Sequence, residues 1–316
     1  MFDPIEPPSG IRCSIAMSER RVVVTGGTGL VGRQVVEVLL GRGWEVVVLS
    51  RSAKSSDRTG LQYGVWDGRS GAGLEEAFRG AKAVVHLAGE NVSQRWTRRA
   101  KDAILNSRIE GGTAVRDAIE SLPESERPAL VAASAIGWYA SSSEWQDERT
   151  PAGPSGFLAE VVKAWEGVFN GIATRHVTLR IGVVLSRKGG ALAQLEPLFK
   201  WGFGSAVGSG NQWQSWIHVE DLARLFADAV EQAQWEGVYN AVAPNPVTNR
   251  ELSAALAKTM GKPFWAPAPP AFVMKAVLGE MSAIVLDSQR IRSTRLNGDD
   301  FKFPELAEAL ADLYAS

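Results

Sequence analysis

Cysteine and histidine are scarce in the sequence, and this limits the chemistry that it can hold. Its 316 residues include one cysteine, Cys13, and three histidines that lie far apart, His86, His176 and His218. A single cysteine excludes an intramolecular disulfide, and the histidines do not have the spacing of metal ligands. We therefore expect no metal centre and a reducing compartment, either the cytoplasm or an organelle stroma.

The sequence also lacks an excess of charge of one sign and a long apolar run. Lysines and arginines number 34, against 35 aspartates and glutamates, so we expect neither nucleic acid nor a membrane as a partner. No apolar stretch approaches the roughly 20 residues of a membrane helix. Residues 1–16 lack the basic start and apolar stretch of a secretory signal, and we expect a tail over residues 1–19. The partner class that remains is a small molecule, and a homodimer stays open.

Short β-branched runs alternate with helical patterns through the first 180 residues. The predicted strands are 21–25, 45–49, 61–66, 83–87, 129–134 and 176–181, and the predicted helices are 29–42, 73–79, 96–121 and 155–171. Such alternation places parallel strands side by side, with helices on both faces. It predicts an α/β fold, a Rossmann-type doubly wound parallel sheet.

The pattern changes after residue 186. Glycines crowd residues 189–210, and proline-broken helical segments fill residues 248–316. Between them an amphipathic helix is predicted to about residue 232, followed by a strand. We expect a smaller, mostly helical substrate lobe beside the Rossmann domain. The expected division is a domain at 20–185, to which 215–242 returns, and a lobe at 186–214 and 243–316.

A glycine-rich turn joins the first predicted strand to the first predicted helix. Residues 26–32 read GGTGLVG and contain Gly27-x-Gly29-x-x-Gly32. Glycines let the backbone approach a pyrophosphate closely, and the free amides at the start of the next helix attract its negative charge. Because a strand precedes the motif and a helix follows it, we predict a dinucleotide site rather than a purely structural turn. The predicted contacts in this turn are Gly26, Thr28, Gly29, Leu30, Val31 and Gly32.

The end of the second predicted strand indicates which dinucleotide binds. An NAD site usually has an acid there for the ribose hydroxyls. This chain instead has Ser50 and Arg51, and Lys54 could assist Arg51. A guanidinium suits a 2′-phosphate in its charge and in its fork of donors. We therefore predict NADPH over NADH; the alternative is that Arg51 is a solvated surface residue.

The ends of the next two predicted strands complete the predicted cofactor site. Asp67 would meet the adenine edge or would serve as a turn residue. Leu87, Ala88 and Gly89 end the following strand, and the small residues among them would let the backbone lie beside the cofactor. His86, in that apolar run, is predicted to be a buried residue rather than a catalyst.

Four segments in this order resemble the extended short-chain dehydrogenase/reductase superfamily. They are TGGTGLVG at 25–32, VVHLAG at 84–89, SAIGWYA at 134–140 and WIHVEDLA at 216–223. Further stretches are similar to its atypical YfcH-type epimerase branch, among them APNPVTNREL at 243–252 and LGEM at 278–281. The resemblance covers about residues 20–312. It implies an NAD(P)-binding Rossmann fold with a C-terminal substrate lobe, and it implies no particular substrate.

The resemblance also implies a catalytic Tyr-x-x-x-Lys, whose lysine lowers the pKa of the phenol so that it can exchange a proton. At the matching positions this chain has Phe157 and Val161. Candidate substitutes are Ser134 at the end of a predicted strand, Tyr139 in the next loop, where it could point into the cleft, and Glu160 beside Phe157. The alternative for each is structural: a strand-end hydrogen bond, packing under the loop, or exposure to solvent.

Candidate substrate contacts lie in two parts of the chain. Arg95 and Arg108 would bind an anionic substrate or the nicotinamide-side phosphate, unless Arg108 forms a salt bridge on its helix. Gln212, Trp216 and His218 cluster in a glycine-flanked loop. Their amide and rings would suit a sugar or a flat ring, and the alternative is a packed hydrophobic corner.

Three functions stay open. The first is an NADP(H)-binding oxidoreductase that acts on an unknown small molecule with an unusual proton donor. The second is a nucleotide-sugar epimerase or dehydratase, which still needs a base, so the missing tyrosine and lysine count against it. The third is a cofactor-binding sensor or scaffold with little chemistry, which the missing pair favours.

Overall fold

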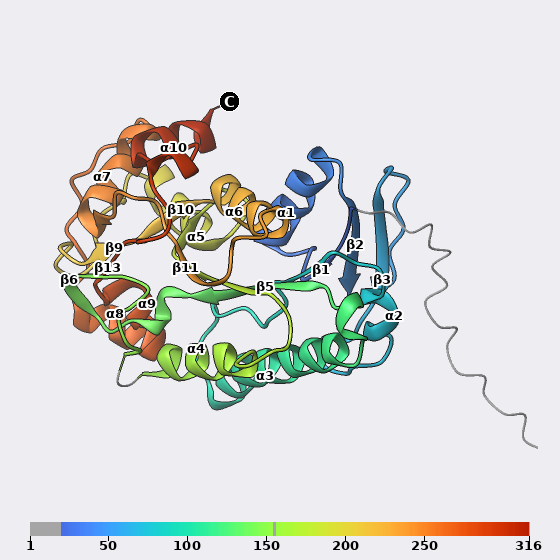
Figure 1. Ribbon diagram of the computed structural model, residues 1–316. Helices are drawn as coiled ribbons and strands as arrows, with labels where there is room; N and C mark the ends of the chain where they lie inside the picture. Colours follow the sequence, from blue (N-terminus) through green and yellow to red (C-terminus); the bar gives the residue numbers. More distant parts are fainter. Residues whose placement is uncertain (1–19, 154–155, 316) are drawn as a thin grey trace, which may run out of the picture.

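A parallel sheet forms the centre of the protein (Figure 1). The computed structural model describes residues 20–153 and 156–315, and within them the largest sheet has seven strands. The strands are β1 (Arg21–Thr25), β2 (Glu45–Ser50), β3 (Leu61–Val65), β4 (Ala83–His86), β5 (Ala129–Ala135), β7 (His176–Ile181) and β11 (Gly237–Ala241). Their order is β11-β7-β5-β4-β1-β2-β3, and all neighbours are parallel. The predicted doubly wound α/β fold is confirmed.

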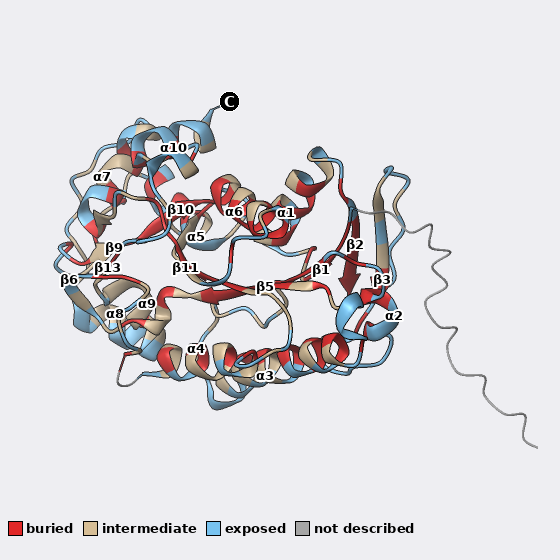
Figure 2. Cartoon of the chain, viewed as in Figure 1, coloured by how far each residue is buried: buried red, intermediate tan, exposed pale blue. Residues whose placement is uncertain are grey.

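Helices cover both faces of this sheet. The helices α1 (Leu30–Gly41) and α6 (Val219–Glu231) pack together on one face, and α3 (Arg98–Glu120) and α4 (Phe157–Val168) pack together on the other, with α2 (Leu74–Phe78) beside α3 (Figure 1). These helices connect successive parallel strands, as crossover connections must. Their buried sides face the sheet (Figure 2).

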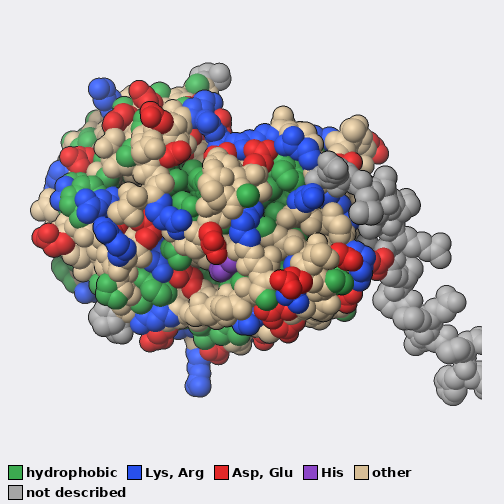
Figure 3. All heavy atoms as spheres, viewed as in Figure 1, with side chains coloured by type: hydrophobic (Ala, Val, Ile, Leu, Met, Phe, Trp, Pro, Cys, Tyr) green, Lys and Arg blue, Asp and Glu red, His purple; other side chains and the backbone are tan. Residues whose placement is uncertain are grey.

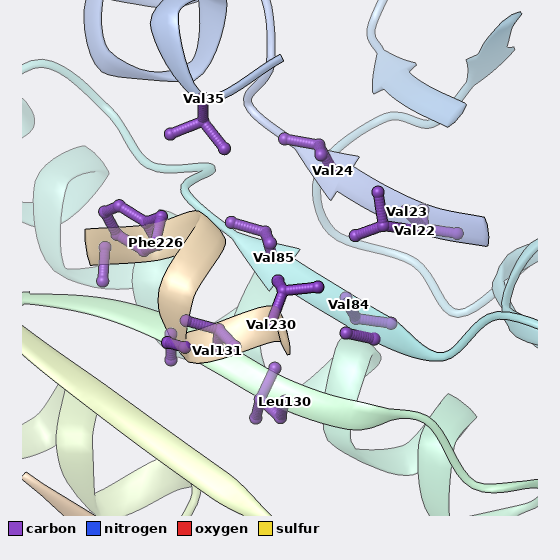
Figure 4. Packing of buried hydrophobic residues seen from close by; sticks show 14 of the residues in the cluster. Val22, Val23, Val24, Val35, Val84, Val85, Leu130, Val131, Phe226 and Val230 are labelled. Atoms are coloured by element: carbon purple, nitrogen blue, oxygen red, sulfur yellow. The ribbon is translucent and has the colours of Figure 1, made fainter. Parts of the chain in front are cut away.

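The main core lies between the sheet and its helices. It contains the valines of β1 (Val22–Val24) and β4, onto which Val35 of α1 and Phe226 and Val230 of α6 pack (Figure 4). Because the inner strands are buried on both faces, their sequences are continuous apolar runs rather than alternating patterns. This burial explains why the sequence predicted these strands well.

The rest of the chain combines helices with short strands. The helices are α5 (Gly190–Lys200), α7 (Asn249–Thr259), α8 (Ala271–Leu278), α9 (Ala283–Leu286) and α10 (Leu306–Tyr314); the strands are β6 (Ser142–Gln146), β8 (Val183–Leu185), β9 (Trp213–Gln214), β10 (Trp216–His218), β12 (Val247–Thr248) and β13 (Gln289–Ile291). They pair as β10–β8, β12–β9 and β13–β6. The C-terminal region is mostly helical, as predicted, but the sequence did not predict these short strands.

The start of α6 anchors the segment that leads to α10. The carboxylate of Asp221 accepts the backbone N–H groups of Lys302 at 2.8 Å and Phe303 at 3.0 Å. The Nδ1 atom of His218 accepts the N–H of Glu220 at 3.2 Å and caps the helix, while its ring lies 4.2 Å from the ring of Phe303. These polar contacts add to the packing of Phe303 and Leu306 in a second hydrophobic cluster and hold the C-terminal segment in place.

The surface carries both signs of charge. Basic and acidic side chains are intermixed over the face in Figure 3, in keeping with the formal net charge of -1. Within residues 20–153 and 156–315, no helix combines the length and apolar character that crossing a membrane requires. The tail expected at residues 1–19 lies outside the described residues.

Candidate functional site

The glycine turn between β1 and α1 is packed too closely for side chains. Gly26 has a φ of +70°, and a Cβ atom on it would lie 2.7 Å from the carbonyl carbon of Leu87. A Cβ atom on Gly32 would lie 2.3 Å from the carbonyl oxygen of Gly26. The turn is closed by the N–H of Gly29, which donates to the same oxygen at 2.9 Å. Only glycine allows this approach of strand end, turn and helix.

The first amides of α1 are available to a ligand. Gly29 is the N-cap residue and supplies no side-chain cap. The N–H groups of Leu30, Val31 and Gly32 therefore lack intrahelical acceptors, as the first residues of any α-helix do. Together with the positive end of the helix dipole, they form an anion-binding site of the type that holds a pyrophosphate.

A cavity of about 260 Å³ lies beside this turn, at the carboxyl ends of the strands. Several of its lining residues are those predicted for the cofactor: Gly26, Thr28, Gly29, Ser50, Arg51, Asp67, Leu87, Ala88 and Gly89. The cavity is also lined by residues that were not predicted from the sequence: Leu49, Trp66, Gly68, Arg69, Glu90 and Ser107. Most of these flank predicted residues, so the strand ends were a signal that could have found them. In doubly wound folds, ligands bind at this edge of the sheet.

Two arginines line the cavity where β2 and β3 end. Arg51 is exposed and forms no hydrogen bond or ion pair with the described residues. Arg69 has one ion pair, with Glu110 at 3.4 Å, and its side chain is largely exposed. The side chain of Ser50 donates to the carbonyl of Ser52 at 2.6 Å and holds the turn that presents Arg51. The two guanidinium groups favour an anionic ligand at this end of the cavity.

Asp67 serves as a turn residue, which is one of the two roles predicted for it. Its Oδ1 accepts the backbone N–H groups of Arg69 and Ser70, both at 2.8 Å. These hydrogen bonds hold the pKa of Asp67 below its usual value. The carboxylate thus fixes the turn that carries Arg69, and it still lines the cavity.

Arg108 is a buried cation next to the cavity. Its Nη1 donates to the carbonyl oxygens of Glu90 at 3.1 Å and Ile104 at 2.9 Å, and its guanidinium lies 4.8 Å from the ring of Trp165. Burial lowers its pKa to about 10. The salt bridge that we predicted as the alternative role of Arg108 is absent from the part of the chain that the structure describes. The buried guanidinium lies beside Gly89 and forms no ion pair with a carboxylate of the described residues. It is therefore suited to an anionic group of a ligand.

Ser134 and Tyr139 belong to a buried network. The Ser134 hydroxyl donates to Glu166 at 2.5 Å, and Arg180 donates to both oxygens of Glu166 at 2.8 Å. The Tyr139 hydroxyl donates to Asn240 at 2.7 Å and accepts from Arg180 at 3.1 Å. Burial raises the pKa of Tyr139 above its ordinary value of 10.0, although Arg180 opposes this. The expectation that Tyr139 could face an open cleft is not met, since its hydroxyl points into the protein.

The positions of the missing tyrosine and lysine lie on α4. Phe157 is its first residue, and its ring lies 4.9 Å from the ring of Trp96 and 5.2 Å from the ammonium of Lys101. Val161 is buried in the core and carries no polar group. Glu160 is exposed to solvent, which is the alternative that we predicted to a catalytic role. None of the three supplies the acid–base pair of the superfamily.

The loop with the predicted substrate contacts folds into the protein. Trp216 has no exposed surface, and its indole donates to the carbonyl of Asn245 at 2.9 Å. Gln212 is buried and donates to the carbonyls of Val207 and Val285, both at 2.9 Å. His218 caps α6. Buried side chains with these partners cannot contact a ligand in this conformation. The three residues therefore fit the alternative prediction, a packed corner of the protein, better than a substrate site.

Of the predicted substrate contacts, Arg95 has the exposure that a ligand needs. It lies in the segment before α3, and its guanidinium has no hydrogen bond or ion pair with residues 20–153 or 156–315. It remains a predicted substrate contact.

One group of side chains in the described part of the chain brings three possible metal ligands together. Atoms of His218, Glu220 and Asp312 lie within 4.8 Å of one another. Because Nδ1 of His218 accepts a hydrogen bond, the neutral ring carries its proton on Nε2, which lies 3.4 Å from Asp312. Burial keeps the pKa of His218 below its ordinary value, so the ring is neutral at pH 7. A protonated Nε2 offers no lone pair to a metal.

The parallel sheet, the glycine turn and the cavity at the strand ends define a protein of the Rossmann class. A family model described as the NAD dependent epimerase/dehydratase family matches residues 22–157, and one described as a domain of unknown function matches residues 269–313. The chloroplastic SDR39U1 homolog of Arabidopsis thaliana, an epimerase family protein, is 37% identical over 307 residues, which cover 93% of this chain and 86% of the relative. The chain therefore belongs to the epimerase family that includes SDR39U1, and the resemblance given by its motifs is confirmed.

Solved structures agree with this assignment. The crystal structure of human SDR39U1 with NADPH superposes with a TM-score of 0.83 at 32% identity, covering 93% of this chain and 99% of that one. The UDP-glucose 4-epimerase of Thermus thermophilus, solved with NAD, gives a TM-score of 0.70 at 25% identity, covering 93% and 99%. Both likenesses extend over nearly the whole chain, so the C-terminal region is part of the shared fold.

Proposed function

We propose that the chain binds NADPH along the glycine turn and acts as an oxidoreductase on a small molecule. One observation carries the choice of cofactor: Arg51 and Arg69 line the cavity where β2 and β3 end, and β2 ends in Ser50 and is followed by Arg51 instead of an acid. A 2′-phosphate would meet two guanidinium groups there. The NADPH of the human SDR39U1 structure supports the proposal.

Each part of the site has a defined task in this proposal. The amides of Leu30, Val31 and Gly32 hold the pyrophosphate, and the backbone of residues 87–89 lies beside the rest of the cofactor. Arg108 neutralises negative charge on the nicotinamide side. Bound NADPH supplies a hydride, so this chain's residues must bind, orient and exclude water around the substrate.

An oxidoreductase that reduces a carbonyl also needs a source of a proton. Ser134 and Tyr139 stay the predicted donors, and their hydroxyls must leave Glu166 and Asn240 to reach a substrate. Because both hydroxyl groups already have hydrogen-bond partners in the protein, they favour the alternative of a cofactor-binding sensor with little chemistry. An epimerase or dehydratase would need a base as well, and Phe157 and Val161 supply none.

Paired titrations with NADPH and NADH test the cofactor assignment. Tryptophan fluorescence follows binding to the wild type, to Arg51→Ala and to Lys258→Ala, the last being a control because Lys258 is exposed on α7 and does not line the cavity. We expect Arg51→Ala to weaken NADPH binding at least tenfold and to leave NADH binding unchanged, and Lys258→Ala to change either by less than threefold. Equal affinities of the wild type for the two cofactors would refute the assignment.

Turnover separates the candidate functions. The absorbance of reduced nicotinamide is followed with a panel of quinones, aldehydes and ketones. Consumption of NADPH that Ser134→Ala or Tyr139→Phe reduces at least 100-fold would establish an oxidoreductase. Tight binding without consumption of NADPH would instead favour the sensor.

A further inference from the structure

A second hollow lies at the opposite edge of the main sheet from the glycine turn. It is an open depression of about 600 Å³, lined by Arg20, Trp44, Lys82, Arg127, Ala129, Thr174, Arg175, Val230 and Glu231. Several of these residues directly precede strands β1, β2, β4 and β7. Because the strands are parallel, these positions share one edge, about 17 Å from the glycine turn by the length of β1. A ligand in the depression would not overlap a cofactor.

Basic side chains dominate the lining of this depression. Arg20, Lys82, Arg127 and Arg175 face a single lining acid, Glu231. The carboxylate of Glu231 is already shared, because it accepts from Arg20 at 2.9 Å, from Arg42 at 2.8 Å and from the indole of Trp44 at 2.8 Å. It neutralises little of the charge on the other side of the depression.

Two of the arginines cap helix ends and keep their charge. Arg127 donates to the carbonyl of Glu120, the last residue of α3, at 3.1 Å. Arg175 donates to the carbonyls of Ala229 at 3.0 Å and Trp235 at 2.9 Å, near the end of α6. In the described residues neither guanidinium pairs with a carboxylate. The lining holds four cations and one carboxylate, and each of the two capped helix ends offsets about half an elementary charge. The lining therefore keeps a net charge of about +2.

Lys82 has no structural task that would explain its position. It is exposed, and its ammonium has no hydrogen bond or ion pair with residues 20–153 or 156–315. The lining also lacks a free aromatic face, because Trp44 is buried and its indole N–H is bound to Glu231. A ligand that suits this surface has several anionic oxygens and no large apolar part.

We propose that this depression binds a compact polyanion of the polyphosphate class, held by Lys82 together with the guanidinium groups of Arg127 and Arg175. Each cation keeps N–H donors for charge-assisted hydrogen bonds. The site is independent of the cofactor cavity and of the function proposed for it.

Calorimetric titration of the full chain with inorganic tripolyphosphate, at fixed ionic strength, tests the site. It is done without NADPH and again with saturating NADPH, which excludes tripolyphosphate from the glycine turn. We expect saturable binding of one ion when NADPH is present, and any additional ion bound only in its absence belongs to the glycine turn. Lys82→Glu should weaken the binding with NADPH present at least tenfold, whereas Lys258→Glu should change it less than twofold, since Lys258 is exposed on α7 and its ammonium likewise has no partner among the described residues.

Three results would overturn the proposal. They are the absence of saturable binding, loss of binding when NADPH is present, and equal weakening by Lys82→Glu and Lys258→Glu, which would indicate a general effect of charge. Lys82→Gln, which removes the charge without reversing it, should weaken binding to an intermediate degree. Circular dichroism checks that each variant is folded, as the exposure of both lysines leads us to expect.

Discussion

At the scale of single residues, Gly26 and Gly32 hold positions that any side chain would disturb. The positive φ of Gly26 strains other residues, and the missing Cβ of Gly32 lets α1 begin against the carbonyl of Gly26. The obstacle in each case is backbone, which cannot rotate away as a side chain can. The anion-binding amides of α1 therefore depend on these two glycines.

Gly32→Ala should harm both the fold and the site. Its Cβ would lie 2.3 Å from the oxygen of Gly26, so we expect a loss of about 1–3 kcal/mol in the free energy of unfolding and at least tenfold weaker NADPH binding. Gly41→Ala, on the same helix, is the control: it has open space around it and should be neutral or stabilising by about 0.5–1 kcal/mol. Urea unfolding and cofactor titration measure both. Equal effects of the two substitutions would contradict this account.

The sequence predicted site residues best where local structure decides their position. The glycine turn and Arg51 follow from the strand that precedes each, and both line the cavity. Tyr139 and Gln212 were placed less well, because their hydrogen-bond partners, Asn240 and Val285, are 101 and 73 residues away in the chain. No local pattern reveals whether a polar side chain is satisfied inside the protein.

At the scale of elements, a buried ion pair ties α4 to β7. The side chains of Arg180 and Glu166 are 4% and 13% exposed, and the guanidinium also lies 3.8 Å from the ring of Trp138. The pair brings Ser134 of β5 into the same network. Such a pair fixes the geometry of the elements that end at the edge of the sheet where the cavity lies.

Breaking this pair should cost far more than breaking a surface pair. Glu166→Gln leaves the Arg180 charge buried without a carboxylate, and we expect a loss of about 3–5 kcal/mol. Replacing both residues with methionine should recover part of that loss, because no lone charge remains. Glu75→Gln, which breaks an exposed pair between Glu75 of α2 and Arg79 just after the helix, should cost less than about 0.5 kcal/mol. Urea unfolding measures all of these variants, and similar losses for Glu166→Gln and Glu75→Gln would show that the network is not stabilising.

The element scale also shows where sequence patterns end. Long buried strands and amphipathic helices were predicted within a few residues of their bounds. The strand pairs β12–β9 and β13–β6 were not predicted, because these strands have two to five residues and pair with segments far away in the chain. Their pairing depends on the fold around them and leaves no period to detect.

At the scale of the whole molecule, stability should depend on pH through a histidine inside the main core. His86 has no exposed surface, and its Nδ1 atom lies 2.8 Å from the hydroxyl of Thr25. Burial, and to a lesser degree the charge of Arg108, lowers the pKa of His86 to about 4. The unfolded chain, in which the pKa is near its ordinary 6.5, therefore binds a proton between these pH values while the folded chain does not.

The free energy of unfolding should consequently fall as the pH decreases from 6.5 toward 4, with the full stability present above that window. At pH 5 His86 alone should account for a loss of about 2 kcal/mol relative to pH 7.5. His86→Gln removes the titrating group, so its loss between the two pH values should be smaller than that of the wild type by this amount, whatever its stability at pH 7.5. Carboxylates such as Glu148, whose pKa is lowered in the folded protein, contribute equally to both chains and cancel in the comparison. Urea unfolding at the two pH values gives the difference, and identical losses in the two proteins would mean that His86 takes up a proton as readily in the folded chain as in the unfolded one.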